Sequence, residues 1–227
     1  MKKEFVDFLL NRGALKLHNE NDPEGLFTLK SGRRSPFFMN MGDLNKGADL
    51  IALGKAYARA AYDQWGRGID VFFGPAYKGI PLATATAMQY NLICNGEASY
   101  CADRKEIKDH GDVGGLVGAK LHDGDRVVII EDVTTSGKSI SEVMPKIKAA
   151  ANVEVLGLIV SLNRMEYSSE DNRKQTALET IEQEYGFKAI AIASIADVLK
   201  VVPLSEEERN KFKTYYEKYG VEGASVL

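Results

Sequence analysis

The stretch from Val127 to Ser139, VVIIEDVTTSGKS, decides the fold predicted for this chain. It begins with four β-branched apolar residues, and such an unbroken apolar run is typical of a parallel strand buried on both faces. Glu131 and Asp132 follow, at the end of the strand where ligands bind in open α/β sheets. Hydroxyl residues and Gly137 then form a turn before an expected helix at 139–150. Because a helix N-terminus offers free N–H groups and a positive dipole end, this layout predicts a phosphate site.

Two other interpretations of this stretch are possible. The triplet Gly137-Lys138-Ser139 suggests a Walker A nucleotide loop, but that motif needs a glycine where Asp132 stands. The second alternative is an ordinary strand with an acid pair and a capped helix, without a ligand. The order of apolar run, acids, hydroxyl-rich turn and helix favours the phosphate site instead. The segment resembles the phosphoribosyl-diphosphate signature of the type I phosphoribosyltransferases.

The composition limits the class of protein. The chain has 227 residues and a formal net charge of −3, so no bulk positive charge draws it to nucleic acid or to an anionic membrane. The N-terminal stretch lacks the apolar core of a signal peptide, and no apolar run reaches membrane-spanning length. Cys94 and Cys101 have no metal-like spacing and are expected to be free thiols. We therefore expect a cytoplasmic protein with one generous α/β domain or two small ones.

Apolar periodicity predicts strands that alternate with helices along the chain. Strands are expected at 69–73, 92–94, 99–101, 127–131, 155–162 and 189–193, and helices at 4–11, 44–65, 79–90, 139–150, 174–185, 195–200 and from 205. Residues 103–118 are charged and then glycine-rich, and a long loop is expected there. The alternation implies an α/β fold with a doubly wound, mainly parallel sheet. No repeat or linker divides the sequence, so a single domain spanning 1–227 is expected.

Three further segments carry side chains suited to anionic ligands. In GPAYKGIP, from Gly74 to Pro81, Lys78 is placed in a tight turn after a strand, where a point charge suits a polyphosphate. RKEIKDHG, from Arg104 to Gly111, heads the glycine-rich stretch and could close over a polyanion as a mobile cationic loop. FTLKSGRRSPFFMN, from Phe27 to Asn40, puts cations beside aromatic residues, as a flat anionic ring requires. The alternatives are a solvated lysine, a solvated loop and an edge hairpin.

Arg164 is a fourth candidate, because it follows the apolar strand that ends at Leu162. At a strand's carboxyl end, an arginine could pair a substrate carboxylate through two parallel hydrogen bonds. Taken alone, the residue reads equally well as a surface arginine.

Together, FTLKSGRRSPFF, GPAYKGIP, RKEIKDHG and EDVTTSGKS, in this order and with Arg164, resemble the orotate phosphoribosyltransferases. The resemblance runs from about residue 27 to residue 164, and Met39 departs from it, where an aromatic residue is expected. It implies the type I phosphoribosyltransferase fold, with a small hood built from about residues 1–45 and a mobile catalytic loop at 103–118. It also implies the reaction of orotate with 5-phosphoribosyl 1-diphosphate to orotidine 5′-phosphate and diphosphate, in de novo pyrimidine synthesis, with Mg²⁺ as cofactor.

The resemblance assigns roles to individual residues. The catalytic residues that it implies are Arg104, Lys105, Lys108 and His110, which close over the diphosphate, and Asp132, which serves the ribose hydroxyls with Glu131. The remaining substrate-binding residues that it implies are Lys30, Phe38, Met39, Tyr77, Lys78, Val133, Thr134, Thr135, Ser136, Gly137, Lys138, Ser139 and Arg164. No protein ligand to Mg²⁺ is expected, since diphosphate, ribose and water would hold the ion. A homodimer is implied, in which the loop reaches the neighbouring site.

Two alternative functions on the same fold are distinguished by sequence features. A purine or uracil salvage phosphoribosyltransferase needs the Val127 to Ser139 segment but not LKSGRRSPFF and RKEIKDHG. A ligand-sensing regulator with the same fold would usually carry a nucleic-acid-binding element, and no basic helix or extra domain is visible in the sequence. Retention of all the loops favours an enzyme.

Overall fold

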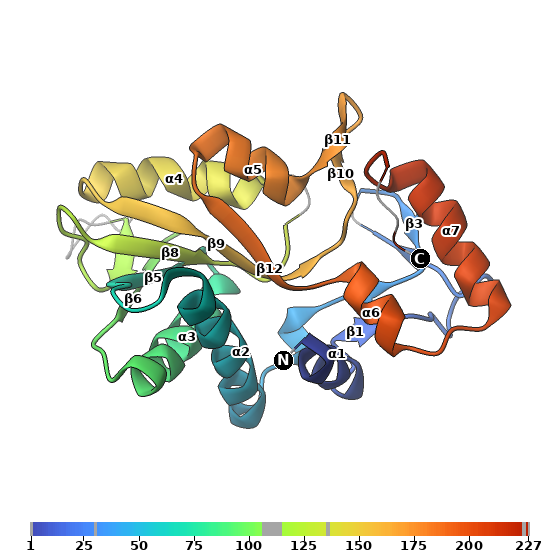
Figure 1. The fold of residues 1–227 in the computed structure, drawn as a ribbon, viewed down its shortest axis with the longest axis horizontal. Helices are drawn as coiled ribbons and strands as arrows, with labels where there is room; N and C mark the ends of the chain where they lie inside the picture. The colour runs from blue at the N-terminus through green and yellow to red at the C-terminus, as the bar shows by residue number, and fades with distance from the viewer. Residues whose placement is uncertain (1, 30, 106–114, 135–136, 224–225, 227) are drawn as a thin grey trace.

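The computed structural model describes residues 2–29, 31–105, 115–134, 137–223 and 226, and the centre of this part is a six-stranded sheet (Figure 1). The strand order is β12 (Lys188–Ser194), β9 (Glu154–Asn163), β8 (Arg126–Ile130), β5 (Val71–Gly74), β6 (Ser99–Asp103) and β7 (Leu116–Gly118). Neighbouring strands run parallel, except for β6 and β7, which are antiparallel. The predicted α/β fold with a mainly parallel sheet is therefore confirmed.

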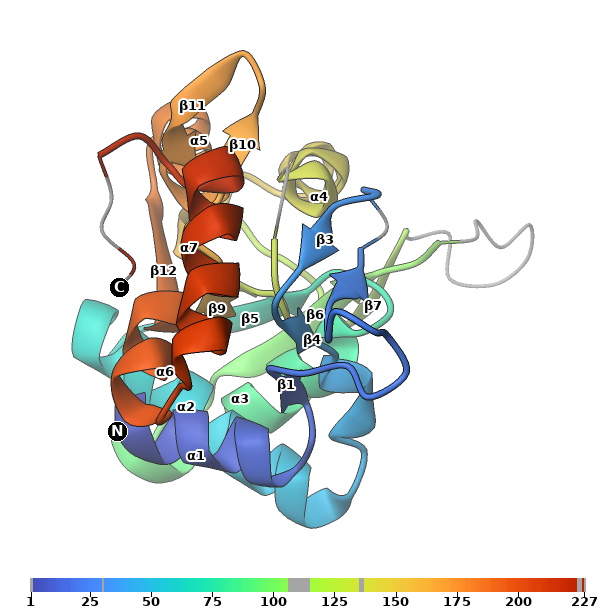
Figure 2. The same ribbon diagram turned by 90° about the vertical axis from the view of Figure 1, so that its right-hand side faces the viewer.

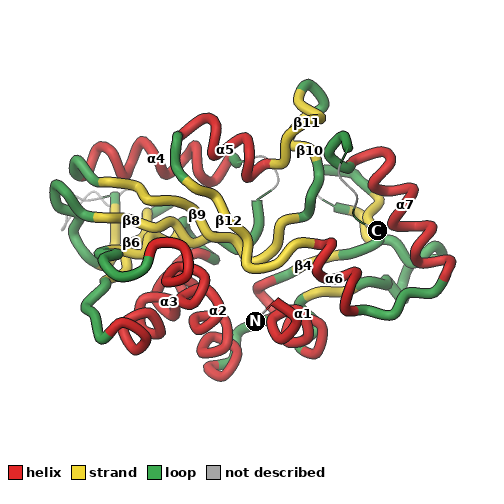
Figure 3. Tube along the Cα trace, viewed as in Figure 1, coloured by secondary structure: helices red, strands yellow, loops and turns green. Residues whose placement is uncertain are grey.

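Helices cover both faces of this sheet (Figure 3). The helices on one face are α2 (Gly47–Trp65) and α3 (Gly79–Cys94), and those on the other are α4 (Lys138–Ala150) and α5 (Ala177–Tyr185). Successive strand side chains point to opposite faces, so Phe72 joins one core and Phe73 the other. Gly54 lets α2 approach α3 closely, because a Cβ atom there would lie 2.4 Å from the carbonyl oxygen of Ala85.

Short elements from both ends of the chain form a hood beside the sheet, as Figure 2 shows. Its elements are α1 (Lys2–Asn11), β1 (Leu15–Lys16), β2 (Phe27–Thr28), β3 (Arg34–Ser35), β4 (Phe38–Met39), a 3₁₀ turn (Met41–Asp43), α6 (Ile195–Val201) and α7 (Glu206–Tyr219). β1 pairs with β4 and β2 pairs with β3, both antiparallel. Phe37 stacks on Phe212 of α7, with ring centroids 6.0 Å apart. The C-terminal helix therefore belongs to the hood, which the family resemblance places in the N-terminal region.

Three predicted elements differ from the structure. Residues 92–94 form the last turn of α3 rather than a strand, because the helix continues until Asn95 takes the left-handed conformation, with φ 52°. The helix predicted at 174–185 begins only at Ala177, since Thr176 caps it through a capping box with Glu179. The residues before this cap form β11 (Asn172–Thr176), which pairs with β10 (Tyr167–Ser169). In the loop expected at 103–118, residues 116–118 form strand β7, and residues 106–114 lie outside the described part.

Candidate active site

The acid pair Glu131 and Asp132 lies buried directly after β8. The main-chain N–H of Glu131 donates to Ile159 of β9 at 3.0 Å, and the N–H of Ser161 donates to the carbonyl of Asp132 at 2.9 Å. The hydroxyl of Ser161 donates to the same carbonyl at 2.5 Å, and the hydroxyl of Tyr57 on α2 donates to the carbonyl of Glu131 at 2.8 Å. The main chain of the pair is thus fixed from β9 and from α2, and neither Tyr57 nor Ser161 was singled out from the sequence.

The two acids have different electrostatic surroundings. Burial, and then the negative charge of Asp132, raise the pKa of Glu131 to about 7. Asp132 instead accepts a hydrogen bond on Oδ2 from Nζ of Lys78, at 3.2 Å. The structure therefore brings Lys78, predicted from a different strand, to the acid pair. It leaves Asp132 with a cationic partner and Glu131 without one among the described residues.

The turn after the acid pair leads into a helix that no side chain caps within the described residues. Gly137, with φ 71°, precedes α4, and its N–H donates to the hydroxyl of Thr134 at 3.1 Å. A serine or threonine caps each of α5, α6 and α7 through a capping box, whereas α2 and α3, like α4, begin without a side-chain cap. The free N–H groups at the start of α4 are consequently available to an anion, with the positive end of the helix dipole behind them. Thr135 and Ser136, predicted members of this turn, lie outside the described residues.

The segment that carries Tyr77 and Lys78 follows β5, next to the acid pair. Tyr77 is 68% exposed, although it is a large aromatic residue. The N–H of Ala76 donates to Oδ1 of Asp103, at the end of β6, at 2.7 Å. Two neighbouring strand ends are thereby joined, and the predicted diphosphate residues lie at their junction.

The predicted catalytic loop is described only at its two ends. The N–H of Arg104 donates to the carbonyl of Gly115 at 2.8 Å, and its Nε donates to the carbonyl of Leu116 at 3.3 Å. Lys105 forms an ion pair with Glu142 of α4, with Nζ 3.4 Å from Oε2. Lys108 and His110 lie outside the described residues, as does Lys30 of the hood.

Arg164 is buried, so the alternative of a surface arginine is wrong. Its Nε and Nη2 lie 2.8 Å and 2.7 Å from Oε1 of Glu166, and its guanidinium carbon lies 4.0 Å from the centre of the Phe37 ring. Arg33 binds the other carboxylate oxygen of Glu166, with Nη1 2.9 Å from Oε2. Glu166 thus fixes both arginines. In the sequence, the only sign of this role is that Glu166 lies two residues after Arg164. Thr134 and Arg164 line the same narrow pocket, between the end of β9 and the start of α5.

Phe38 and Met39 reach the site from the hood. The ring of Phe38 stacks on that of Phe27, with centroids 5.5 Å apart. Sδ of Met39 lies 3.9 Å from the hydroxyl oxygen of Ser161, the residue that binds the main chain of Asp132. Met39, which departs from the family pattern, is therefore close to the acid pair.

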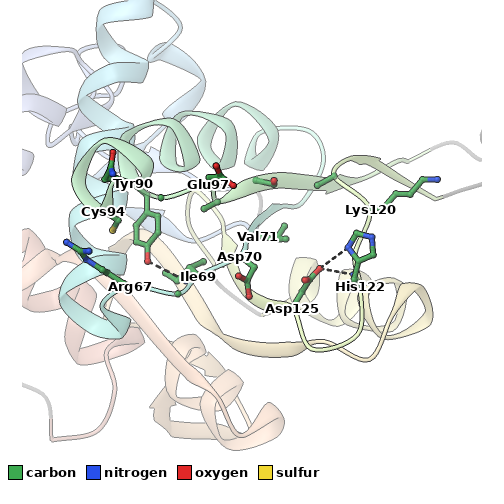
Figure 4. A pocket seen from close by; sticks show the side chains of 16 residues that line it. Arg67, Ile69, Asp70, Val71, Tyr90, Cys94, Glu97, Lys120, His122 and Asp125 are labelled. Carbon is green, nitrogen blue, oxygen red and sulfur yellow. Dashed lines mark hydrogen bonds and ion pairs between the residues drawn. The ribbon is translucent and has the colours of Figure 1, made fainter.

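A hollow of about 630 Å³ lies at the other end of the strands (Figure 4). Arg67 and Lys120 lie there beside Asp70, Glu97 and Asp125, a mixture of charges without a common sign. The N–H of Arg126 occupies Oδ2 of Asp70, and the N–H of His122 occupies Oδ2 of Asp125. Ligands of open α/β sheets bind at the carboxyl ends of the strands, so the acid pair marks the candidate site and this hollow does not.

Comparisons with known proteins match this arrangement to one family. The phosphoribosyl transferase domain model matches residues 41–194. The orotate phosphoribosyltransferase of Lachnoclostridium phytofermentans is 46% identical over 97% of this chain and 98% of its own. That of Agathobacter rectalis is 48% identical over 96% of this chain and 97% of its own. The chain belongs to the orotate phosphoribosyltransferase family.

Solved structures of orotate phosphoribosyltransferases share the fold. The enzyme of Francisella tularensis is 35% identical, with a TM-score of 0.80, over 96% of this chain and 99% of that one. The Mycobacterium tuberculosis enzyme in complex with 5-phospho-α-D-ribosyl 1-diphosphate is 20% identical, with a TM-score of 0.60, over 87% of this chain and 98% of that one. The second likeness concerns the fold alone.

Proposed function

We propose that the chain transfers the 5-phosphoribosyl group from 5-phosphoribosyl 1-diphosphate to orotate, giving orotidine 5′-phosphate and diphosphate, as a step of de novo pyrimidine synthesis. The observation that carries this proposal is the buried acid pair placed directly before the uncapped N-terminus of α4. A sugar phosphate needs these two features side by side, because carboxylates accept hydrogen bonds from its hydroxyls and a helix N-terminus binds its phosphate. Membership of the orotate phosphoribosyltransferase family then gives the base.

The sugar phosphate is assigned to the acid pair and the turn after it. Asp132 and Glu131 accept hydrogen bonds from the ribose hydroxyls, with Asp132 as the charged partner because Lys78 stabilises its carboxylate. The 5′-phosphate is bound by main-chain N–H groups and hydroxyls of the turn. The residues of this phosphate site are Val133, Thr134, Thr135, Ser136, Gly137, Lys138 and Ser139.

Cationic groups on two segments serve the diphosphate leaving group. Displacement at the anomeric carbon passes through an oxocarbenium-like transition state, in which the leaving group gains negative charge. Tyr77 and Lys78 bind the diphosphate, and the four loop residues Arg104, Lys105, Lys108 and His110 close over it. Positioning and charge stabilisation, rather than covalent catalysis, account for the rate.

The orotate ring is assigned to the space between the hood and the phosphate turn. Lys30, Phe38 and Met39 approach from the hood, and Thr135 and Arg164 from the sheet side. Glu166 binds Nε and Nη2 of Arg164, so the orotate carboxylate is assigned to Nη1, which has no hydrogen-bond partner among the described residues.

Mg²⁺ fits this donor set as an ion brought by the substrate. Among the described residues, no group of three or more His, Cys, Asp or Glu side chains could hold a metal ion. Mg²⁺ keeps several waters and favours phosphate partners, so diphosphate, ribose oxygens and water would hold the ion, and no protein ligand is assigned. When bound, the ion would neutralise part of the charge on the diphosphate.

We further propose that the protein acts in the cytoplasm as a homodimer. Within the described residues, no helix is both long enough and apolar enough to cross a membrane. Large apolar side chains are exposed on the neighbouring helices α2 and α3, namely Ile51, Met88, Leu92 and Ile93. A second copy of the chain would cover this apolar surface, and the loop at 103–118 is proposed to reach the neighbouring site.

A spectrophotometric assay with 5-phosphoribosyl 1-diphosphate and Mg²⁺ tests the proposal, with orotate, uracil, adenine and xanthine offered separately. Consumption of orotate alone is expected. Turnover of another base would keep the sugar-phosphate site but overturn the assigned substrate. Binding of 5-phosphoribosyl 1-diphosphate without any turnover would point to a ligand sensor instead.

A further inference from the structure

Asp103, the last residue of β6, is a buried acid that has no assigned role in the proposed reaction. The residue is 1% exposed, and its side chain is inaccessible to solvent. Oδ1 accepts the N–H of Ala76 at 2.7 Å, in the turn that carries Tyr77 and Lys78. Oδ2 lies 2.5 Å from Nζ of Lys146 on α4. Each carboxylate oxygen therefore binds a different segment of the chain.

Lys146 adds a third segment to this contact. Its Nζ also lies 3.5 Å from the carbonyl oxygen of Arg104, where the catalytic loop begins. Lys146 belongs to the same helix whose N-terminus faces the phosphate turn. The Asp103–Lys146 pair thus joins the turn after β5, the start of the loop and α4 at a single point.

A buried ion pair is poor evidence of stability for its own sake, because desolvation of the two charges offsets most of their attraction. Such a pair does fix geometry, since a buried carboxylate tolerates few other arrangements of its partners. Two of the segments joined here, the turn after β5 and the start of the loop, are assigned to the diphosphate, and the third, α4, to the 5′-phosphate. The described residues assigned to orotate, Phe38, Met39 and Arg164, form no hydrogen bond or ion pair with Asp103 or Lys146.

We propose that Asp103 and Lys146 are positioning residues that fix Tyr77 and Lys78 relative to Arg104 and Lys105, and so set the geometry of the diphosphate site. This inference rests on the proposed assignment of those four residues to the diphosphate. It predicts that binding of 5-phosphoribosyl 1-diphosphate and of the product diphosphate depends on the pair, whereas binding of orotate does not.

The decisive variant is Asp103→Asn, which keeps the size of the side chain and the acceptor for the Ala76 N–H but removes the charge. If Asp103 acted only through its field, removal of a negative charge near a polyanion would tighten diphosphate binding. A positioning role predicts weaker diphosphate binding instead. Lys146 loses its partner, so the start of the loop and the turn after β5 are no longer joined through the pair. We expect diphosphate affinity and kcat/KM for 5-phosphoribosyl 1-diphosphate to fall by roughly tenfold to a hundredfold, the usual consequence of small misplacement in a site.

Four further variants complete the experiment. Lys146→Met removes the more exposed partner of the pair and should lower diphosphate affinity as Asp103→Asn does. Lys146→Arg keeps the positive charge and should keep most of the wild-type affinity. The double variant Asp103→Asn/Lys146→Met should bind diphosphate no more weakly than the single variant with the lower affinity, because both changes break the same contact. Arg59→Met removes an exposed ion pair of α2, with Arg59 Nε 2.9 Å from Oδ1 of Asp63, and should leave every constant unchanged.

The measurements are calorimetric titration with inorganic diphosphate in Mg²⁺, and steady-state kinetics in both substrates. Weaker diphosphate binding in Asp103→Asn, with an unchanged KM for orotate, is the expected result. Tighter diphosphate binding, an equal loss for both substrates or no loss at all would overturn the inference. Because titration needs no turnover, a wild-type chain that binds diphosphate without consuming orotate would refute the proposed reaction and leave this inference standing on the binding data. If Asp103→Asn fails to fold, Lys146→Met decides the question on the same measurements.

Discussion

The hydroxyl of Tyr57 on α2 donates a hydrogen bond to the main-chain carbonyl of Glu131, at 2.8 Å. Tyr57 is fully buried, and burial raises the pKa of its hydroxyl well above the ordinary value, so this group remains a donor throughout the physiological pH range. A helix without any predicted site residue thereby fixes the position of the acid pair. The geometry of the acid pair depends on the packing of α2 as well as on the strand that carries the acids.

Tyr57→Phe removes this donor and nothing else. A buried carbonyl left without its partner costs about 1–3 kcal/mol. We expect the free energy of unfolding, measured by urea denaturation, to fall by about that amount, together with a several-fold drop in kcat. Tyr62→Phe on the same helix, where the side chain is only half-buried, is the control. A variant with unchanged stability and turnover would show that the Tyr57 contact has no such role.

The raised pKa of Glu131 makes stability depend on pH. Its value in the folded protein, about 7, lies above the ordinary carboxyl value, so between roughly pH 4.5 and 7 the folded state holds a proton that the unfolded state has lost. This group therefore stabilises the fold below that window, and its contribution falls as the pH rises through about 7. Glu131→Gln should flatten the fall in melting temperature between pH 5 and 8, relative to wild type. Glu154→Gln, an exposed acid at the far end of β9, should not change the profile. Parallel profiles for wild type and Glu131→Gln would contradict the assignment.

Arg164→Ala should weaken orotate binding more than binding of 5-phosphoribosyl 1-diphosphate. Loss of one partner from a buried, hydrogen-bonded charge pair costs about 2–5 kcal/mol, so the KM for orotate should rise at least tenfold. Fluorescence or calorimetric titration with each substrate separates the two effects. Glu166→Gln serves as a matched variant, because it disturbs the anchor of Arg164 and leaves the guanidinium in place. Equal losses for both substrates in Arg164→Ala would remove it from the orotate pocket.

Lys108→Ala tests the catalytic loop. Its charge is assigned to the leaving group, so turnover should fall strongly, by about a hundredfold, while the melting temperature stays unchanged. Lys120→Ala, an exposed lysine beyond the loop, is the comparison. If Lys108→Ala turns over at the wild-type rate, Lys108 has no part in the mechanism.

Phe212→Ala tests the contribution of the C-terminal helix to the hood. Phe212 is 1% exposed and stacks on Phe37, whose ring lies beneath the guanidinium of Arg164. Truncation of a buried phenylalanine costs about 3–5 kcal/mol, measurable by chemical denaturation. The KM for orotate should rise as well, since Phe37 supports Arg164. Phe8→Ala on α1, at a partly buried position, should cost less and leave orotate binding intact.

The sequence predicted much of this arrangement because the relevant patterns are local. The apolar run before Glu131 predicts a buried strand, and the hydroxyl-rich turn predicts the phosphate site. The β10–β11 hairpin was missed, because NRKQT has neither an alternating nor a continuous apolar pattern. Contacts between distant segments, such as that of Asp103 with Lys146, have no sequence pattern at all, since only the folded chain brings the end of β6 to the third turn of α4.

The residues that follow β9 illustrate the same limit. Arg164 was singled out by its place after a strand, but its ion pair with Glu166 depends on a sharp change of direction at Met165, which takes a positive φ of 57°. A methionine rarely adopts a positive φ, so the residue type at position 165 does not predict this conformation.

We assign catalysis to the acid pair and not to the hollow at the opposite end of the strands. The most direct measurement compares kcat/KM for 5-phosphoribosyl 1-diphosphate in Asp132→Asn and in Glu97→Gln, one acid-to-amide change at each place. A hydrogen bond to a charged group contributes about 1.5–3 kcal/mol, so Asp132→Asn should lose roughly tenfold to a hundredfold, whereas Glu97→Gln should match wild type. A loss in Glu97→Gln with wild-type kinetics in Asp132→Asn would contradict the account.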